Sequence, residues 1–349
     1  MAINGKNQIT ALTSTRAIAA IMVFIYHYGS WAQPFISMSP KNLIRNGNIA
    51  VNYFFVLSGF VLYIAHAGKP LNYLPYIVKR LARIAPLYWV ALAATLAISY
   101  WFNYAPITAN VVQQTLYSAL FLQSYIPNYA LTLNIPAWSL SIEMFFYLVF
   151  PALLFAAHKK FKVFATAGII LYLASQLIHL HYYPIRGQLG DNILDTVFFS
   201  PIIHINQFII GMLGGYIYQK TIDRPLNIPF IPAAVLAIVA LVLACKPPTI
   251  SMQVGLLSPL FLLMIIALAK RRSAILEWRP LVYLGEISYG IYILQYPVYG
   301  ALYLLNNHYF NFNGTILFYA GLTMLILTSE LLYRIIEMPV NNWAKRFGK

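Results

Sequence analysis

The chain is organised as long apolar runs separated by short polar loops that carry most of its basic residues. Several stretches of 18 or more residues, such as 46–67 and 251–269, contain no Asp, Glu, Lys or Arg. An α-helix needs about 20 apolar residues to cross the hydrocarbon core of a bilayer. The pattern predicts ten membrane-spanning helices, at residues 12–31, 48–66, 84–102, 138–157, 163–180, 201–219, 229–245, 252–269, 283–303 and 313–334.

A chain with this pattern is expected to form an all-α, polytopic transmembrane helical bundle. Hydrophobic residues make up 60% of the 349 residues and charged residues only 9%, whereas soluble domains carry about 25% charged residues. So apolar a chain could not cover a water-facing surface. We therefore expect residues 1–349 to form a single integral-membrane domain with no appended soluble domain. The first apolar run lacks a cleavage-site pattern, so we expect it to be a retained helix.

The basic residues indicate which side of the membrane each loop occupies. With the N-terminus placed in the cytoplasm, 19 of the 23 Lys and Arg residues fall on the cytoplasmic side. This asymmetry is typical of inner loops, so it predicts that both termini are cytoplasmic. It also accounts for the net charge of +15 without a nucleic-acid partner. A full crossing by residues 107–125 would invert every later loop, so we interpret this segment as an outer-surface or re-entrant helix.

Ionisable residues within the predicted spans are the first candidates for function, because each costs at least about 2.5 to 3.5 kcal/mol to insert. Arg16 and His27 lie 11 residues apart in the first span. This is almost three helical turns, so both side chains project from one face, about 16 Å apart. Glu143, on the oppositely directed fourth span, is predicted to reach the depth of His27. A carboxylate there would orient the imidazole; alternatively, Glu143 pairs with a basic residue for structural reasons only.

Arg80 and Arg83 form a second candidate site, at the predicted cytoplasmic mouth of the third span. Residues i and i+3 share a helix face, and two guanidinium groups on one face suit phosphate groups. The alternative is ordinary anchoring of a cytoplasmic loop, which any basic cluster beside a span would provide.

Three neutral polar residues complete the candidate site. Ser58 precedes Gly59 in an apolar span, where a pair of small residues commonly allows close helix packing, but Ser58 could also shape a pocket. Ser141 could hydrogen-bond the acceptor or the base, or serve the structure alone, and Gln295 lies in the middle of the ninth span. The single Cys245 excludes an intramolecular disulfide and the common multi-cysteine zinc sites, and we expect no metal.

Taken together in their order along the chain, these motifs resemble those of the acyltransferase family 3. The members of this family are membrane proteins that O-acylate carbohydrates of bacterial envelopes. The resemblance covers nearly the whole chain, although each motif alone is weak. The matching segments are Arg16 to His27, GNIAVNYFFVLSGFVL from Gly47 to Leu62, RLAR from Arg80 to Arg83, AWSLSIE from Ala137 to Glu143, YLGEISYGIYILQYPV from Tyr283 to Val298, and Glu337-Met338-Pro339. One departure is Gln295, where many relatives carry His. Because Gln cannot act as a base at neutral pH, we interpret it as a substrate-positioning residue.

The resemblance implies an O-acyltransferase of the bacterial cytoplasmic (inner) membrane, surrounded by membrane lipids. Its donor would be an acyl-CoA, most commonly acetyl-CoA, and its acceptor a hydroxyl of an envelope glycan or lipid-linked glycan. His27 and Glu143 would be catalytic, with His27 either a general base or a transient acyl carrier. The donor would bind Arg16, Arg80 and Arg83. Some relatives append an extracytoplasmic domain, so a partner protein on the outer side could complement this chain. The substrate-positioning residues would be Ser58, Ser141 and Gln295.

Two other classes of function stay open. Ten spans with a buried His and Glu would suit a proton-coupled transporter of a small solute or glycan intermediate. The sequence shows no inverted repeat and no matching pair of broken helices, which many transporters have. A structural scaffold for an envelope-polysaccharide complex is a third interpretation. Release of thiol from acetyl-CoA that depends on His27 would distinguish the enzyme from both.

Overall fold

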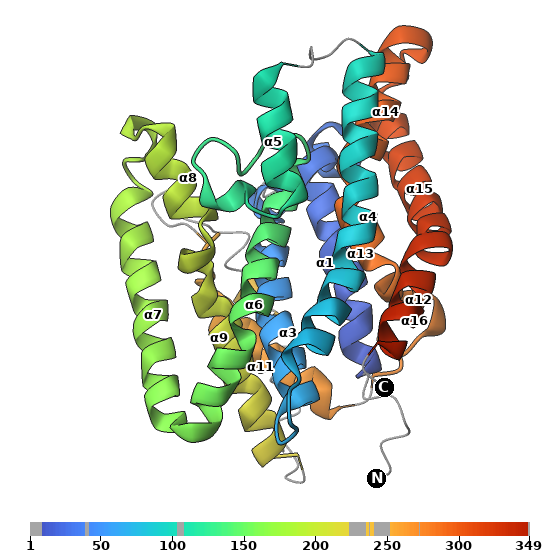
Figure 1. Cartoon of the computed structure of the whole chain (residues 1–349). Helices are drawn as coiled ribbons and strands as arrows, with labels where there is room; N and C mark the ends of the chain where they lie inside the picture. The colour runs from blue at the N-terminus through green and yellow to red at the C-terminus, as the bar shows by residue number, and fades with distance from the viewer. Residues whose placement is uncertain are drawn as a thin grey trace.

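The computed structural model describes residues 9–38, 42–102, 108–222, 235–236, 238–240, 252–271 and 273–347. Every regular element among these residues is a helix, which confirms the all-α prediction for the described part of the chain. The helices run side by side in one bundle. The start of α1 (Thr10–Tyr28) lies at the same end of this bundle as the C-terminal helix α16 (Met338–Arg346) (Figure 1).

Six stretches of the described chain are helical, long and apolar enough to cross a membrane. They correspond to six of the ten predicted spans. They are α3 (Ile49–His66), α4 (Tyr73–Trp101), α6 (Trp138–Lys159) with the preceding turn η4 (Ile135–Ala137), α7 (Phe161–Tyr182), α8 (Asp191–Phe199) continued by α9 (Pro201–Lys220), and α15 (Gly314–Leu332) continued by η7 (Tyr333–Glu337) and α16.

The other four predicted spans have different outcomes. Residues 12–31 correspond to α1, which packs within the bundle, and residues 252–269 contain the shorter apolar helix α11 (Ser258–Lys270). The span predicted at 283–303 is divided into three short helices, namely α12 (Arg279–Glu286), α13 (Ser288–Ile293) and α14 (Gln295–Leu305). The span predicted at 229–245 lies mostly outside the described residues. The count of ten spans and the cytoplasmic termini therefore stay predictions.

The helix that contains the third predicted span is longer than that span. Helix α4 already begins at Tyr73. Pro75 falls in its first turn, where proline is tolerated, and Tyr76 is buried against the bundle. Arg80 and Arg83 therefore lie about 10 and 15 Å along the helix axis from its start.

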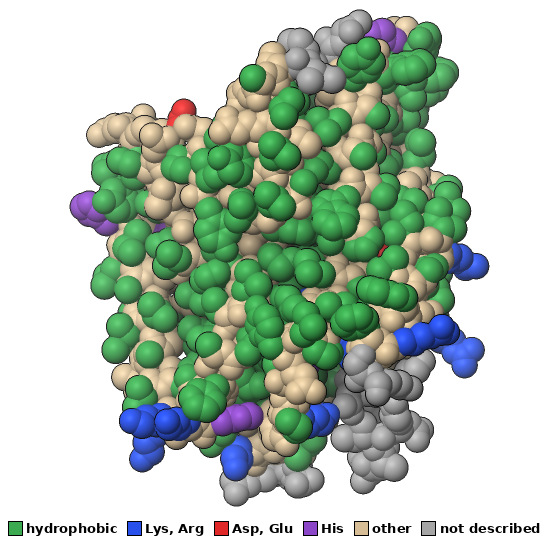
Figure 2. Space-filling view, viewed as in Figure 1, with side chains coloured by type: hydrophobic (Ala, Val, Ile, Leu, Met, Phe, Trp, Pro, Cys, Tyr) green, Lys and Arg blue, Asp and Glu red, His purple; other side chains and the backbone are tan. Residues whose placement is uncertain are grey.

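The surface of the bundle is apolar over its middle. Helix α7 is hydrophobic, yet most residues of its apolar stretch are not buried inside the protein, and Leu173 and Leu177 are exposed. Figure 2 shows hydrophobic side chains over the middle of the visible face and Lys and Arg side chains gathered towards the end where α1 starts. We call this end the basic end. Continuous exposed apolar surface of this kind is typical of protein in contact with lipid tails.

Helices α3 and α9 pack closely, because glycines bring their backbones together. A Cβ atom added at Gly59 would lie 2.0 Å from the carbonyl oxygen of Phe208, and one added at Gly211 would lie 2.0 Å from that of Val56. Small residues let helices approach closely in membranes. In the Ser58-Gly59 pair, the glycine therefore allows the two helices to pack closely. The Ser58 side chain is half-buried.

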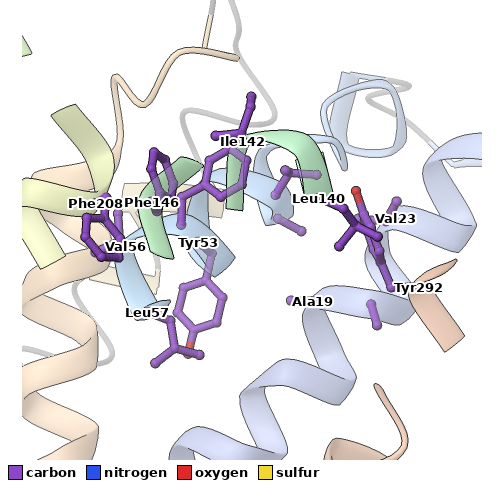
Figure 3. Packing of buried hydrophobic residues seen from close by; sticks show 14 of the residues in the cluster. Ala19, Val23, Tyr53, Val56, Leu57, Leu140, Ile142, Phe146, Phe208 and Tyr292 are labelled. Atoms are coloured by element: carbon purple, nitrogen blue, oxygen red, sulfur yellow. The ribbon is translucent and has the colours of Figure 1, made fainter. Parts of the chain in front are cut away.

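An apolar core surrounds this crossing. Lipid tails are as apolar as leucine, so hydrophobicity alone does not hold helices together in a membrane, and close packing must contribute. The ring of Phe146 in α6, for example, stacks on that of Phe208 with centroids 4.7 Å apart. Side chains of this core are shown in Figure 3 and include Ala19, Val23, Tyr53, Val56, Leu57, Leu140, Ile142, Phe146, Phe208 and Tyr292.

The break between α13 and α14 is tied to a proline. Pro297 has no N–H group to offer to the carbonyl of Ile293, four residues earlier. This carbonyl instead accepts a hydrogen bond of 3.0 Å from Nδ2 of Asn134. The continuous span predicted at 283–303 is therefore interrupted, and the end of α13 is joined to the segment that precedes α6.

In the segment predicted at 107–125, the structure describes residues 108–125 and shows one short α-helix followed by a 3-10 turn. Helix α5 (Ala109–Ala119) has 11 residues, about 16 Å in length, which is too short to cross a bilayer. It lies towards the end opposite the basic end (Figure 1). Phe121 then has a φ of 60°, and the chain turns into the bundle through η3 (Gln123–Tyr125). This geometry supports the interpretation of an outer-surface or re-entrant segment.

Gly211→Ala should destabilise the folded protein, because the new methyl group would collide with the Val56 carbonyl and force α3 and α9 apart. Overpacking of this kind costs about 1–3 kcal/mol. Gly300→Ala is the matched control, since Gly300 is also helical and a Cβ atom there would meet nothing within 4 Å. Thermal unfolding of the detergent-purified proteins should show a lower unfolding temperature for Gly211→Ala and an unchanged one for Gly300→Ala. Equal unfolding temperatures would contradict the close backbone contact.

Candidate active site

Three arginines and two glutamates from four separate segments converge within the bundle. They are Arg16 of α1, Arg80 and Arg83 of α4, Glu143 of α6 and Glu337 of η7. Arg83 and both glutamates lie within electrostatic range of Arg16, and Arg80 lies within range of Arg83 and Glu143. We call these five residues the charge cluster. The structure therefore brings together the three arginines that the sequence assigned to one phosphate site.

Two tyrosines hold α4 against α6 at the charge cluster. Pro151 leaves the carbonyl of Tyr147 without its helical N–H partner, and the hydroxyl of Tyr76 donates to this carbonyl at 3.1 Å. The Tyr147 hydroxyl in turn donates to Oε1 of Glu143 at 2.5 Å. The guanidinium carbon of Arg80 lies 5.8 Å from the ring centroids of both tyrosines, close enough for a cation–π attraction. The proline and its two tyrosine contacts thereby position Arg80 and Glu143.

Glu337 reaches the charge cluster because the chain after α15 stays against the bundle. Residues Tyr333–Glu337 form a wide π turn, and α16 then packs against α4. The Glu337 side chain is only 6% exposed. Its Oε1 atom has no hydrogen-bond partner among the described residues, and its charged neighbours are Arg83 and Arg16. Local widening of a helix in this way is frequent at functional sites.

Direct ion pairs do not neutralise the arginines of the charge cluster. Within the described ranges, the pair between Arg334 and Glu330 is the only one closer than 4.0 Å. The Nε atom of Arg80 is buried and likewise lacks a partner there. Three positive charges against two negative ones leave a positive excess in a poorly solvated place, where unpaired charge is costly. An anionic ligand would relieve this cost. The three arginine side chains are only half-buried, so such a ligand could reach them.

His27 lies apart from the charge cluster, near the other end of α1. Its half-buried ring packs against Tyr26 and Tyr28, with ring centroids 4.9 and 5.9 Å away. Tyr28 stacks on Tyr299 of α14 at 3.9 Å and donates a hydrogen bond of 3.4 Å to the carbonyl of Gln295. The structure thus brings the predicted residues His27 and Gln295 to the same level, about three helical turns from the charge cluster.

The predicted pairing of His27 with Glu143 is not formed. Glu143 bonds Tyr147 and faces the arginines, and no contact of His27 with the other described residues involves it. The depth argument assumed that α6 starts at the bundle surface, but α6 starts inside. Just before α6, the carbonyl of Pro136 accepts a hydrogen bond of 2.9 Å from the buried hydroxyl of Tyr292. Glu143 is therefore at the level of the charge cluster.

The three predicted substrate-positioning residues lie in different surroundings. Ser141 is fully buried and donates to the carbonyl of Phe121 at 2.6 Å, so it serves to fix the loop before α6. Ser58 is half-buried on α3. Gln295 is fully buried, its Nε2 donates to the carbonyl of Tyr292, and its Oε1 atom has no partner in the described part of the chain. Gln295 thus combines a place near His27 with an unused polar atom.

The tyrosines that organise this region were not predicted from the sequence. Besides Tyr76 and Tyr147, Tyr289 of α13 donates to the carbonyl of Ile84 in α4 at 2.6 Å. A proline four residues after Tyr147 is visible in the sequence, but the partner of the freed carbonyl depends on tertiary packing. Glu337 was noticed only within its Glu-Met-Pro motif, since its position after the last span placed it in a cytoplasmic tail.

A ligand set for a metal ion is not seen in the ranges that the structure describes. No group of three or more His, Cys, Asp or Glu side chains comes close enough together there. Cys245 lies outside the described residues. The expectation of no metal stays a prediction.

The chain is similar to several known proteins. A family model described as an acyltransferase domain, that of the acyltransferase family 3, matches residues 9–334. The acyltransferase MdmB of Streptomyces mycarofaciens is 26% identical over 95% of this chain and 91% of its own length. The O-acetyltransferase OatA of Staphylococcus aureus is 25% identical over 95% of this chain, which spans only 57% of OatA. The exopolysaccharide production protein ExoZ of Rhizobium meliloti is 26% identical over 71% of this chain and 75% of its own length. No solved structure matches the chain.

Glu337→Gln should lower the stability of the ligand-free protein, because it removes one of the two carboxylates that offset three arginines. Breaking a buried ion pair costs about 3–5 kcal/mol, and we expect about 1–2 kcal/mol here because the groups are not in direct contact. Inorganic pyrophosphate should then stabilise the variant more than the wild type, since a bound anion replaces the lost charge.

Glu330→Gln is the matched control for this measurement. Glu330 lies only seven residues away, but its ion pair with Arg334 is at the surface, where such pairs contribute little. Thermal unfolding with and without pyrophosphate checks the prediction. If Glu337→Gln and Glu330→Gln unfold at the same temperature both with and without pyrophosphate, the charge cluster does not carry an excess of positive charge.

Proposed function

The chain belongs to the acyltransferase family 3, and on this premise we propose that it is a membrane O-acyltransferase. It moves an acyl group from an acyl-CoA to a hydroxyl of an envelope glycan. Acetyl-CoA is the proposed donor, since one relative is an O-acetyltransferase. The acceptor class is a polysaccharide or its lipid-linked precursor, since another relative acts in exopolysaccharide production. The proposed location is the bacterial cytoplasmic membrane, with the basic end inside.

The observation that carries this proposal is the charge cluster. Arg16, Arg80 and Arg83 gather without direct ion pairs in the half of the bundle near the basic end. Guanidinium groups match phosphate oxygens in geometry as well as charge, and coenzyme A carries several phosphates. The donor would therefore bind from the cytoplasm, with its phosphates among these arginines. Glu143 and Glu337 would hold the guanidinium groups in place rather than act on the thioester.

Helix α1 connects this donor site to His27. Arg16 and His27 lie on one face of the helix, about 16 Å apart. The pantetheine arm of coenzyme A is long enough to extend along this face from the arginines. Its thioester would then lie beside the His27 imidazole, at the level of Gln295. The unused Oε1 atom of Gln295 could accept a hydrogen bond there from a hydroxyl of the acceptor next to the one that reacts.

The acyl transfer itself requires one base. The acceptor hydroxyl oxygen attacks the thioester carbonyl, so that a C–O bond forms and the C–S bond breaks. His27 takes the hydroxyl proton and returns it to the departing thiolate. The products are the O-acylated glycan and the free thiol of coenzyme A. Imidazole suits this role because it gains and loses a proton near neutral pH. Attack by the imidazole itself, through an acyl-imidazole intermediate, would give the same products.

Replacing both Arg80 and Arg83 with Ala should weaken acetyl-CoA binding at least tenfold, because each loses charge-assisted contacts worth about 1.5–3 kcal/mol. Turnover at saturating donor should fall less, since the arginines contact phosphates far from the reacting carbon. Lys79→Ala is the matched control, as Lys79 is a cation on the same helix outside the charge cluster. Calorimetric titration with acetyl-CoA measures the affinity. An unchanged dissociation constant in the double variant would assign the arginines to membrane anchoring.

His27→Ala should reduce acyl transfer by about two to four orders of magnitude, the usual range for loss of a general base. His27→Gln should be nearly as poor, because Gln cannot take a proton. His181→Ala, which removes an exposed imidazole at the end of α7, should transfer normally. Transfer of labelled acetyl to alkali-treated envelope glycan measures the rate. Near wild-type transfer by folded His27→Ala protein, with acetyl-CoA still bound, would rule out this mechanism.

A further inference from the structure

An open pocket lies towards the end of the bundle opposite the basic end, outside the charge cluster. Its volume is ≈ 610 Å³, within the range of about 300–1,000 Å³ that is typical of ligand sites. It forms between the loop before α6, the turn that joins α7 to α8, and α8 itself, whose place is seen in Figure 1. Its polar and aromatic lining includes Asn128, Tyr183, Arg186, Asp191, Asp195 and Gln253.

Two carboxylates face this pocket from α8. Asp191 and Asp195 are one helical turn apart and share a face. The chain has only eight acidic residues, and these are the two that the topology prediction places on the outer side of the membrane. Oδ2 of Asp195 accepts a hydrogen bond of 2.6 Å from the backbone N–H of Asn128, whose side chain donates to Asn192 at 2.9 Å. The loop before α6 is thereby fastened to α8, and the Asp195 carboxylate is held at the pocket wall.

An aromatic side chain forms another part of the wall. The guanidinium carbon of Arg186 lies 4.0 Å from the ring centroid of Tyr183, and its Nη1 donates to the Tyr183 carbonyl at 2.6 Å. The ring of Phe198 lies 6.1 Å from that of Tyr183. Phe199, which also lines the pocket, packs on Trp138 at 5.1 Å. The pocket therefore combines carboxylate and amide groups with supported aromatic rings.

The pocket and the end of α1 that carries His27 lie towards the same end of the bundle (Figure 1). The ring of Tyr26 packs against His27, and Tyr26 lies within electrostatic range of Tyr183 in the pocket lining. The charge cluster lies about three helical turns away along α1. A molecule in the pocket would therefore lie on the side of His27 opposite the arginines.

We propose that this pocket binds the acceptor glycan, with Asp191 and Asp195 recognising hydroxyl groups and Tyr183 supporting the apolar face of a sugar ring. The inference rests on the proposed function, because it assigns the acceptor site of that reaction. Ionised carboxylates only accept hydrogen bonds, so they select hydroxyl donors and repel anionic sugars. Arg186 supplies one positive charge against two negative ones, which leaves the pocket negative. The acceptor class is therefore a neutral, polyhydroxylated ring.

Steady-state kinetics test this assignment. The probe is the neutral fraction of the source cell's envelope glycan, freed of esters by mild alkali, with acetyl-CoA as donor. Asp191→Ala should raise the KM for this glycan about tenfold or more, as expected for a lost hydrogen bond to a charged group, and should change KM far more than kcat. Asp191→Asn, which keeps the shape and one acceptor oxygen, should give an intermediate KM. Glu277→Gln removes one exposed negative charge outside the pocket and serves as the matched control.

Cysteine labelling tests the pocket without requiring catalysis. In a Cys245→Ser background, Leu131→Cys places a thiol in the pocket lining, whereas Ile193→Cys places one on α8 outside it. Both side chains are exposed in the structure, so both thiols should react with a maleimide. The same glycan should slow the labelling of Leu131→Cys severalfold and leave that of Ile193→Cys unchanged.

The two measurements separate this inference from the proposed function. Protection of Leu131→Cys together with a raised KM in Asp191→Ala supports the acceptor site. Absence of protection overturns it, even where the wild type transfers acetyl groups normally. An unchanged KM in Asp191→Ala also overturns it. If the wild type transfers nothing but the glycan protects Leu131→Cys, the pocket binds glycan and the proposed reaction is wrong.

Discussion

The repulsion among three arginines held together in a poorly solvated bundle is the constraint on which the rest of the structure depends. Unpaired charge within a membrane protein is expensive and marks functional sites. Two nearby carboxylates, on Glu143 and Glu337, reduce the repulsion but do not form direct ion pairs with the arginines. The arrangement is therefore poised for an anion, and a phosphate-bearing donor supplies one. The bound donor would thus offset the positive charge that the two carboxylates leave uncompensated.

Backbone irregularities hold this arrangement in place. Prolines leave carbonyls without helical partners, and Tyr76 and Asn134 bond two of them across helices. These bonds fix α4 against α6, and α13 against the start of α6. Helix α1 then sets the distance between Arg16 and His27, because a continuous helix does not change length. The donor arginines and the proposed base are thereby kept about 16 Å apart, with the base facing the end of the bundle where an acceptor would enter.

Local patterns in the sequence predicted part of this picture. Long apolar runs gave the all-α class. The rarity of charge within spans singled out Arg16, and the i, i+3 spacing singled out Arg80 and Arg83; the fold brings these three arginines together. The pairing of His27 with Glu143 failed because counting residues from a span end assumes that the span starts at the membrane surface. Helix α6 starts inside the bundle, which depends on contacts with α13 that are distant in sequence. The burial of Glu337 likewise depends on α16 folding back against α4.

The pocket beside α8 could not be predicted from the spans. Asp191 and Asp195 lie in a connection that the sequence analysis treated only as a loop, and their pocket depends on Asn128, more than sixty residues earlier. Charge scarcity could have provided the signal, because two aspartates one turn apart are unusual in a chain with eight acidic residues. The same scarcity identifies the charge cluster. In a protein this apolar, the few ionisable side chains mark the places where polar ligands are handled.

A cryo-electron microscopy structure of the protein with bound acetyl-CoA tests the central claim most directly. The account predicts phosphate density within hydrogen-bonding distance of guanidinium groups from both α1 and α4, and a pantetheine arm that follows α1 towards His27. Density for the donor elsewhere, with Arg16 and Arg83 moved into direct ion pairs with Glu143 or Glu337, would contradict it.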